Sequence, residues 1–135
     1  QNQITPAGFL NELSYLLSPP RDDAERENFT QKGWRWNWDT GAVWVSELRE
    51  DNRGVMLKGY GRTIDDVGEL LKRFETSKYV VKAVLKMTES ERISFPNGRS
   101  SVFVRFEMNL RVIYGASDLK RLFFDQNEPL PQNND

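Results

Sequence analysis

Acidic side chains are the residues of this sequence whose type and spacing come closest to supporting catalysis. They gather in three short segments: Asp22, Asp23, Glu25 and Glu27; Asp65 and Asp66; Glu89 and Glu91. A pair of carboxylates performs acid–base chemistry when burial separates their two pKa values. Polar residues surround all three segments, so we interpret them as solvated helix caps and ion-pair partners rather than as a catalytic pair.

Composition excludes several classes of function. The 135 residues include no His and no Cys, which removes thiol nucleophiles, His-containing triads and Cys/His zinc sites. Lys and Arg total 19 against 20 Asp and Glu, a net charge of −1, so no global attraction to nucleic acid or anionic membrane is expected. We therefore predict a binding domain rather than an enzyme, with no catalytic residue, no metal and no cofactor.

Two short motifs have the residue types of a ligand site. Residues 59–63 (GYGRT) join a predicted strand to a helix N-terminus, but they lack the spacing of phosphate-binding loops. Phe103 has the place of a base-stacking aromatic in RNA-recognition sheets, without the Gly-aromatic-Gly sequence that precedes it there. We favour a tight strand-to-helix turn for the first and an ordinary amphipathic strand for the second.

Three tryptophans at alternate positions are the most unusual feature of the chain. In an extended segment they would share one side, where large aromatics anchor a partner or cover the end of the protein's own core. We expect at least one to be buried against the first strand, near Val45, or against the first helix. The candidate interface residues are Trp34, Trp36, Trp38, Val43, Trp44 and Val45.

Hydrophobic periodicity predicts the elements that position these residues. Two amphipathic helices are expected over residues 6–17 and 64–75, the second capped by Thr63. Four strands joined pairwise by Asn- and Gly-containing turns are expected over residues 42–50, 55–60, 79–87 and 102–112. The core faces of the last two strands are predicted to hold Val81, Ala83, Leu85, Met87, Val102, Val104, Phe106, Met108, Leu110 and Val112.

Helix–hairpin followed by helix–hairpin predicts an α+β fold. Two αββ units would form a two-layer sandwich with an antiparallel-rich four-stranded sheet, in a circularly permuted ferredoxin-like arrangement. We expect the strands of Val55 and Val102 to be central and mutually parallel. We divide the domain into an N-terminal helix and long irregular Trp-containing lead-in (1–41), a ββαββ core (42–115) and a partly disordered C-terminal tail (116–135).

The two outer strands differ in how strongly their charged side chains discourage another strand from pairing with the open edge. Lys78, Lys82 and Lys86 accompany the strand at 79–87 and discourage strand pairing there. The strand at 42–50 carries its charges only near its end. We therefore expect association to use the edge at Val43 to Val45, with the helix at 5–17 as the alternative surface.

Residues 42–114 resemble the PilN family of type IV pilus assembly proteins. The resemblance lies in a hydrophobic strand, a second strand ending in Gly, a helix with paired leucines and a closing hairpin. The matching positions are Val45 and Leu48; Val55, Leu57 and Gly59; Leu70, Leu71 and Phe74; and the runs 81–85 and 103–110. The tryptophans before the first strand are similar to the lead-in of some members.

The resemblance implies a scaffolding domain of the pilus platform, in the periplasmic part of an inner-membrane protein that serves twitching motility. It implies a PilO-like partner, PilM-like and PilP-like proteins through the full-length assembly, a second copy as a further partner, and no nucleic acid. Membrane contact would come only from a segment upstream of Gln1, since no stretch here has the roughly 20 apolar residues of a spanning helix. Two alternatives remain open: a related type II secretion inner-membrane component, and a ferredoxin-like ligand- or RNA-binding module.

Overall fold

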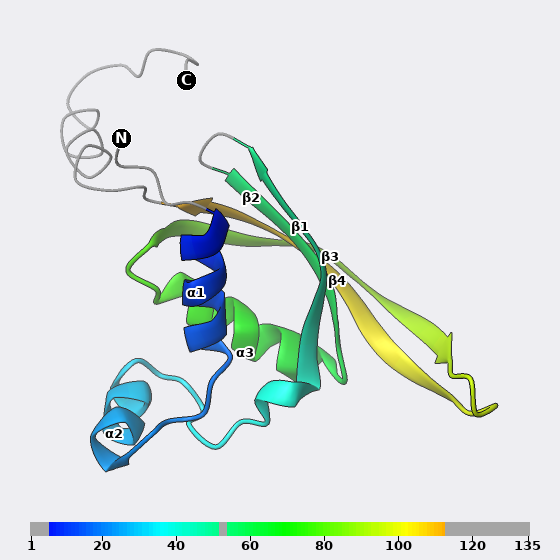
Figure 1. Ribbon diagram of the computed structural model, residues 1–135, viewed down its shortest axis with the longest axis horizontal. Helices are drawn as coiled ribbons and strands as arrows, with labels where there is room; N and C mark the ends of the chain where they lie inside the picture. The colour runs from blue at the N-terminus through cyan, green and yellow to red at the C-terminus, as the bar shows by residue number, and fades with distance from the viewer. Residues whose placement is uncertain (1–5, 52–53, 113–135) are drawn as a thin grey trace.

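The computed structural model describes residues 6–51 and 54–112. Its elements in chain order are α1 (Pro6–Leu16), α2 (Asp23–Gln31), the short 3-10 helix η1 (Thr40–Ala42), β1 (Val43–Asp51), β2 (Gly54–Gly61), α3 (Ile64–Glu75), β3 (Val80–Ser94) and β4 (Ser100–Val112). The helices lie on one side of a single twisted four-stranded sheet, and none of the helices in the described residues lies on its other face (Figure 1). The predicted α+β two-layer architecture is confirmed.

Local sequence explains where α3 begins and how it is oriented. The Thr63 side chain accepts from the backbone N–H of Asp66, and the Asp66 carboxylate accepts from the backbone N–H of Thr63, which completes a capping box. Val67, Leu70 and Phe74 recur at helical spacing and are fully buried. The helix therefore lays one apolar side on the sheet and leaves the opposite side in solvent.

The sheet has the strand order β1-β2-β4-β3, with every neighbouring pair antiparallel. The prediction that β2 and β4 are central is confirmed, but the prediction that they are parallel is wrong. The crossover through α3 makes β3 parallel to β2, and the hairpin then turns β4 back between them. A strand inserted there must be antiparallel to both neighbours, as in a circularly permuted ferredoxin-like sheet.

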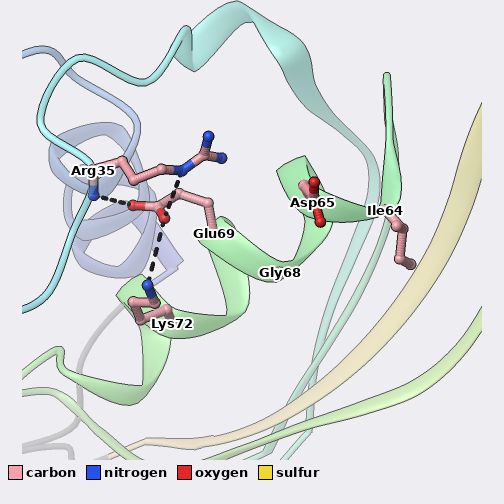
Figure 2. A pocket seen from close by; sticks show the side chains of 6 residues that line it. All are labelled: Arg35, Ile64, Asp65, Gly68, Glu69 and Lys72. Carbon is pink, nitrogen blue, oxygen red and sulfur yellow. Dashed lines mark hydrogen bonds and ion pairs between the residues drawn. The ribbon is translucent and has the colours of Figure 1, made fainter.

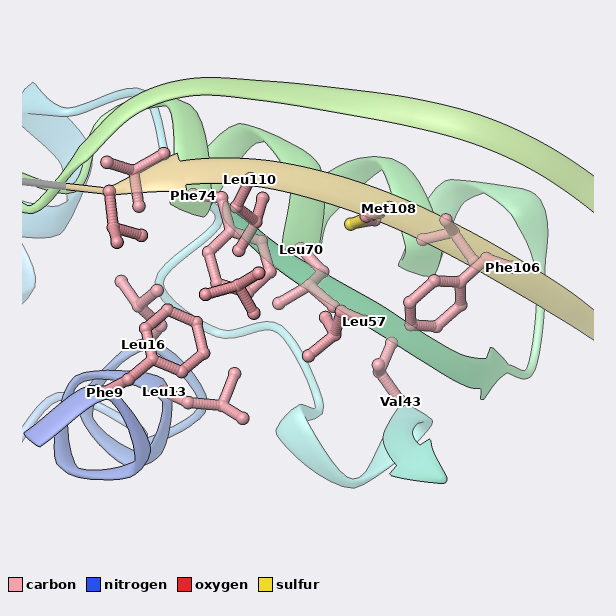
Figure 3. Close-up of a cluster of buried hydrophobic side chains, with 14 of the residues drawn as sticks. Phe9, Leu13, Leu16, Val43, Leu57, Leu70, Phe74, Phe106, Met108 and Leu110 are labelled. Atoms are coloured by element: carbon pink, nitrogen blue, oxygen red, sulfur yellow. The ribbon is translucent and has the colours of Figure 1, made fainter. Parts of the chain in front are cut away.

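The hydrophobic core fills the space between the sheet and the helices (Figure 3). The sheet contributes Leu57 from β2 and Phe106, Met108 and Leu110 from β4, all of them buried. From the helices, Phe9 of α1 stacks on Phe74 of α3 with ring centroids 6.4 Å apart. The alternation predicted for β4 is confirmed from Phe106 to Val112, because these positions face the helix layer.

Two register shifts alter the side-chain pattern predicted for β3. Ala83 and Leu85 pack against the core as expected. The first shift lies between Val80 and Lys82, so Val80 is buried while Val81 is exposed. The second shift lies between Leu85 and Met87, and it places Met87 opposite Glu107 on the outer face. A β-bulge adds one residue to one strand and reverses the alternation beyond it, which period-2 counting does not detect.

The lead-in was wrongly expected to be irregular throughout. It contains α2, where the Asp22 side chain accepts from the backbone N–H of Glu25 at 2.9 Å. This Asp-x-x-Glu spacing is a helix-start signal in the sequence. Phe29 is the one residue of α2 that is buried. The C-terminal tail that we predicted lies outside the described residues.

The β3–β4 hairpin extends past the rest of the sheet and projects as an arm (Figure 1). Gly61 of β2 pairs with Val104, whereas β3 and β4 continue to pair as far as Ser94 with Ser100. Val102, which we placed on the core face, is therefore half exposed, because none of the described helices covers this part of the hairpin. Among the described strands, none pairs with the second edge of β4 at residues 100–103.

Gly59 allows β1 and β2 to approach each other closely. A Cβ atom there would lie 2.3 Å from the Trp44 carbonyl oxygen and 2.8 Å from Cζ of Phe106. Gly59→Ala is therefore expected to lower the free energy of unfolding by about 1–3 kcal/mol, measured by urea denaturation. Gly68→Ala is the matched control: Gly68 lies in α3 with nothing within 4 Å of an added Cβ, so stability should rise by about 1 kcal/mol. Equal stability of Gly59→Ala and wild type would contradict this packing.

Candidate protein-interaction surface

The acidic segments serve as helix caps and surface ion pairs, as predicted. Asp22 caps α2, and a side-chain hydrogen bond from Arg21 lowers the pKa of the Glu25 carboxyl. Glu89 accepts from Arg105 at 2.6 Å on the sheet surface. Within residues 6–51 and 54–112, no group of three or more acidic, His or Cys side chains could hold a metal ion.

The GYGRT segment forms the turn from β2 into α3. A Cβ atom on Gly61 would lie 2.9 Å from Cγ2 of Val67, so glycine lets the helix close onto the strand. The Asp66 carboxylate takes the backbone N–H and the hydroxyl of Thr63, at 3.1 and 2.9 Å. The start of α3 is thus capped by its own acid, which fits the tight-turn interpretation rather than a phosphate site.

Arg73 of α3 is a fully buried cation that ties the N-terminal segment to the helix. Its guanidinium donates to the backbone carbonyl of Leu16 and to that of Arg35, both at 2.8 Å. Burial lowers its pKa, while the hydrogen bond to Glu69 opposes that shift. Arginine remains protonated in proteins, so a full positive charge is held inside the domain.

Glu69 balances the charge of Arg73 from one helical turn earlier. The Glu69 side chain is 1% exposed and accepts from Nε of Arg73 at 3.2 Å. The backbone N–H of Arg35 donates to the same carboxylate at 2.8 Å, and Nε of Arg35 does so at 3.3 Å. A buried charge is tolerated when its partners are paired and hydrogen-bonded, and both conditions hold here.

Trp34 and Trp38 enclose the Arg73 guanidinium and fasten the lead-in to both ends of α3. Their ring centroids lie 4.6 and 4.8 Å from its central carbon, within cation–π distance. The indole N–H of Trp34 donates to Thr76 at the helix C-cap, and that of Trp38 donates to Asp66 in the first turn. Both tryptophans are buried in the monomer, so neither is available to a partner in this structure.

Trp36 lies on the outside of a turn, which makes our assumption of an extended segment wrong. The backbone N–H of Trp38 donates to the carbonyl of Arg35 at 3.1 Å, so the chain reverses at Trp36 and Asn37. The two flanking tryptophans point inward, and Trp36 is 38% exposed under the Arg26 guanidinium. The expectation that at least one tryptophan is buried near the first helix is confirmed, since Trp34 packs beside Tyr15 of α1.

The exposed edge of β1 places its three candidate residues differently. Val43 is buried, Val45 is half-buried and packs on the core, and Trp44 is 39% exposed on the opposite face. A bulge after Val45 interrupts the regular edge. The structure therefore brings Trp44 and the Val43-to-Val45 backbone to the surface and withdraws the Val43 side chain into the core.

Trp44 belongs to an aromatic patch on the helix-free face of the sheet, which we define as Trp44, Tyr60, Phe95 and Phe103. The Trp44 ring stacks on the Tyr60 ring, with centroids 5.4 Å apart, and contacts the Phe103 ring edge-on, with centroids 5.1 Å apart. Phe95 at the tip of the arm is 40% exposed and contacts Phe103. Trp44 and Phe95 are exposed while Tyr60 and Phe103 are half-buried, and such clusters of partly exposed aromatics are typical of protein-binding surfaces.

Sequence reasoning named Trp44 and Phe103 separately, but it missed that they form one patch with Tyr60 and Phe95, and it missed the buried pair of Glu69 and Arg73. Trp44, Tyr60 and Phe103 occupy strand positions that alternate with core residues, where polar side chains are the norm. Glu69 and Arg73 are an i, i+4 pair with the acid first, the favourable orientation on a helix. That the pair is buried depends on where the lead-in folds, which no local pattern shows.

One side of α3 is open to solvent and forms a shallow depression of about 440 Å³. Its lining residues are Arg35, Ile64, Asp65, Gly68, Glu69 and Lys72. Figure 2 shows Gly68 as a bare stretch of helix between Asp65 and Lys72, with Arg35 and Lys72 both directed at Glu69. The depression is too open to enclose a small molecule, since ligand sites bury most of the ligand's surface.

Comparison with known proteins identifies the family. The family model described as "Fimbrial assembly protein (PilN)" matches residues 40–112, from η1 to the end of β4. No curated protein and no solved structure shows significant similarity to the chain. No helix in the described part of the chain is long and apolar enough to span a membrane. Because the match covers more than half of the sequence and the whole sheet with α3, the chain belongs to the PilN family of fimbrial assembly proteins.

Proposed function

We propose that this domain is a non-catalytic scaffold of the type IV pilus assembly platform, which binds a PilO-like partner on the periplasmic side of the inner membrane. Membership of a fimbrial assembly family is the observation that carries the proposal. The absence of His and Cys from the sequence is consistent with a binding role. PilM-like and PilP-like proteins would be reached through the remainder of the assembly.

The proposed contact is the open edge of β1 together with the aromatic patch. Arg62 N–H donates to the Ala42 carbonyl at 2.9 Å, which marks the hydrogen-bonded position of the β1–β2 ladder. Bonded and non-bonded pairs alternate in antiparallel sheets, so Val45, three residues on and opposite Gly59, directs its N–H away from β2. That outward N–H can pair with a strand from a partner.

The aromatic patch would supply most of the binding energy. The bulge after Val45 limits regular pairing between β1 and a partner strand to a short stretch. Such a stretch is long enough to fix the register of the partner strand, but it buries little surface area. Trp44 lies at the same edge and leads onto Tyr60 and Phe103. Trp and Tyr are enriched among residues that dominate interface energetics, and a short edge beside such a patch gives both orientation and affinity.

Val45→Pro tests the edge. Proline removes one outward donor without taking a hydrogen bond from the β1–β2 ladder, so the monomer should fold while the partner strand loses a contact. We expect affinity for the PilO-like protein to fall by roughly tenfold, in line with 0.5–1.5 kcal/mol for the hydrogen bond and some loss of fit. Isothermal titration calorimetry with the purified partner domain measures the effect.

Val45→Thr is the matched control, because threonine keeps both the N–H and the β-branched shape. Trp44→Ala removes the exposed aromatic while leaving the edge intact, and it should weaken binding further than Val45→Pro does. Unchanged affinity in both Val45→Pro and Trp44→Ala, with circular dichroism showing folded protein, would exclude this surface. The exposed side of α1, which carries the half-exposed Leu10, would then be the alternative.

A nucleic-acid role is the second candidate, because aromatics on a helix-free sheet also stack on bases in RNA-recognition domains. The charges next to the patch favour protein instead. Glu91 accepts from the Tyr60 hydroxyl, and Arg105 is already paired with Glu89 and Glu91. Titration with a single-stranded oligonucleotide at low salt separates the two, and only tight, salt-sensitive binding supports the RNA alternative.

A further inference from the structure

The solvent-facing side of α3 carries a regular pattern of charge that contacts within the monomer use only in part. We call it the α3 stripe; its members, in order, are Arg62 just before the helix, then Asp65, Gly68, Lys72 and Glu75. All five are exposed. Asp65 and Glu75 form no ion pair with any residue in the described ranges. Arg62 pairs with Asp39, and Lys72 donates to the Gly33 carbonyl and lies 3.9 Å from the Glu69 carboxylate, yet their side chains remain 55% and 48% exposed.

The pattern is antisymmetric about the middle of the helix. Counted from the point between Gly68 and Glu69, Asp65 and Lys72 lie equally far on either side with opposite charge, and so do Arg62 and Glu75. Asp65 and Lys72 are about 10 Å apart along one helix, at 1.5 Å per residue, so they cannot pair within it. A second α3 in antiparallel orientation would oppose every charge of the stripe with its complement.

Gly68 stands at the centre of this pattern without a reason in the monomer. Nothing lies within 4 Å of a Cβ atom there, and its φ is not in the left-handed region. Glycine inside a helix is destabilising relative to alanine, so the fold would be more stable without it. Glycine allows a close approach here, because two helices that cross at residues without side chains can bring their backbones closer together than helices with larger side chains at the crossing.

We propose that α3 is a two-fold homodimer interface, in which a second copy of this chain docks antiparallel across Gly68. Asp65 of each copy pairs with Lys72 of the other, and Arg62 pairs with Glu75. The half-exposed Ile64 is covered by the opposing helix, and the helix dipoles run in opposite directions. The contact is isologous, so it closes as a dimer. It leaves the β1 edge and the aromatic patch free, and it does not rest on the proposed function.

Charge exchange is the decisive test, with the full 135-residue chain studied by sedimentation equilibrium over a range of concentrations. Lys72→Glu places two like-charge contacts in the dimer and should raise the dissociation constant by at least about tenfold. Asp65→Lys should do the same. Asp65→Lys combined with Lys72→Glu restores complementarity and should recover dimerisation. Lys86→Glu changes the net charge equally on the β3 edge and is the matched control.

Gly68→Gln provides an independent measurement, because glutamine favours the helix but blocks close approach. We expect an unchanged or higher Tm together with loss of the dimer. A wild-type chain that stays monomeric at about 1 mM, or a doubly exchanged variant as weak as either single variant, overturns the proposal. If Val45→Pro loses binding to the PilO-like protein but still dimerises, the partner surface and the dimer surface are separate. If instead Val45→Pro loses the dimer and Gly68→Gln keeps it, the self-contact lies on β1 and the α3 assignment is overturned.

Discussion

Arg73→Ala is expected to lower the free energy of unfolding by about 3–5 kcal/mol, one of the two largest effects in the domain. The substitution leaves the Glu69 carboxylate buried without its closest cation, removes the donors to the Leu16 and Arg35 carbonyls, and opens a cavity between Trp34 and Trp38. Small domains have only about 5–15 kcal/mol of stability in total, so the loss is a large fraction of it. Urea denaturation followed by Trp fluorescence measures the loss.

Two variants separate the contributions of charge and geometry at Arg73. Arg73→Lys keeps the charge but cannot reach both carbonyls with one planar fork, so it should recover only part of the stability. Arg73→Met with Glu69→Gln removes both charges and should be more stable than Arg73→Ala, because no uncompensated ion remains. If Arg73→Ala unfolds at the wild-type urea concentration, the buried pair does not hold the lead-in on α3.

Trp34→Ala is expected to cost about 3–5 kcal/mol, whereas Trp36→Ala, two residues away, should cost about 1 kcal/mol or less. Trp34 is 4% exposed and contacts Phe29, Tyr15 and Arg73, while Trp36 is 38% exposed and has the cation–π contact with Arg26. The two substitutions delete the same side chain, so the difference reports what burial and the hydrogen bond to Thr76 add at Trp34. Thermal denaturation of both variants checks it.

Trp34→Phe refines this comparison by keeping a ring and removing the indole N–H that donates to Thr76. It should lose about 0.5–1.5 kcal/mol for the hydrogen bond plus a smaller packing term. Similar stabilities for Trp34→Ala and Trp36→Ala would show that the lead-in contributes little to the core. Trp36→Ala also reports on binding: lower partner affinity with normal stability would add Trp36 to the proposed contact surface.

The lead-in is an integral part of the domain rather than a linker, although it lies outside the family match. Residues before position 40 supply core side chains from α1, from α2 and from the Trp turn: Phe9, Leu13, Leu16, Phe29, Trp34 and Trp38. Without them, the buried side of Arg73 and the apolar flank of α3 would face water. We infer that the second helix of the two-layer fold, α1, depends on the buried Glu69–Arg73 pair for its position.

The sequence alone determined the elements whose pattern is local. Period-2 alternation placed β2 and β4, the capping residues placed the start of α3, and these together indicated an α+β two-layer fold and the family. Local signals suffice here because a strand or helix that buries one face must repeat its apolar residues at its own period. The same patterns also identified β1 and β3 as the edges.

Only the tertiary structure decided how these elements meet. The antiparallel pairing of β2 with β4 follows from the crossover and the hairpin taken together. The bulges in β3 change which face of the sheet its side chains occupy, and no local sequence pattern predicts them. Trp34, Trp36 and Trp38 look equivalent in sequence, yet a turn at Trp36 buries two and exposes one. From the sequence alone, Arg73 and Glu69 have the spacing of a surface ion pair. In the structure they are buried, because the distant residues Leu16 and Arg35 pack around them and accept hydrogen bonds from Arg73. Burial is a property of the whole fold, because it depends on segments that approach from elsewhere in the chain, and for this reason residue type and spacing could not specify it.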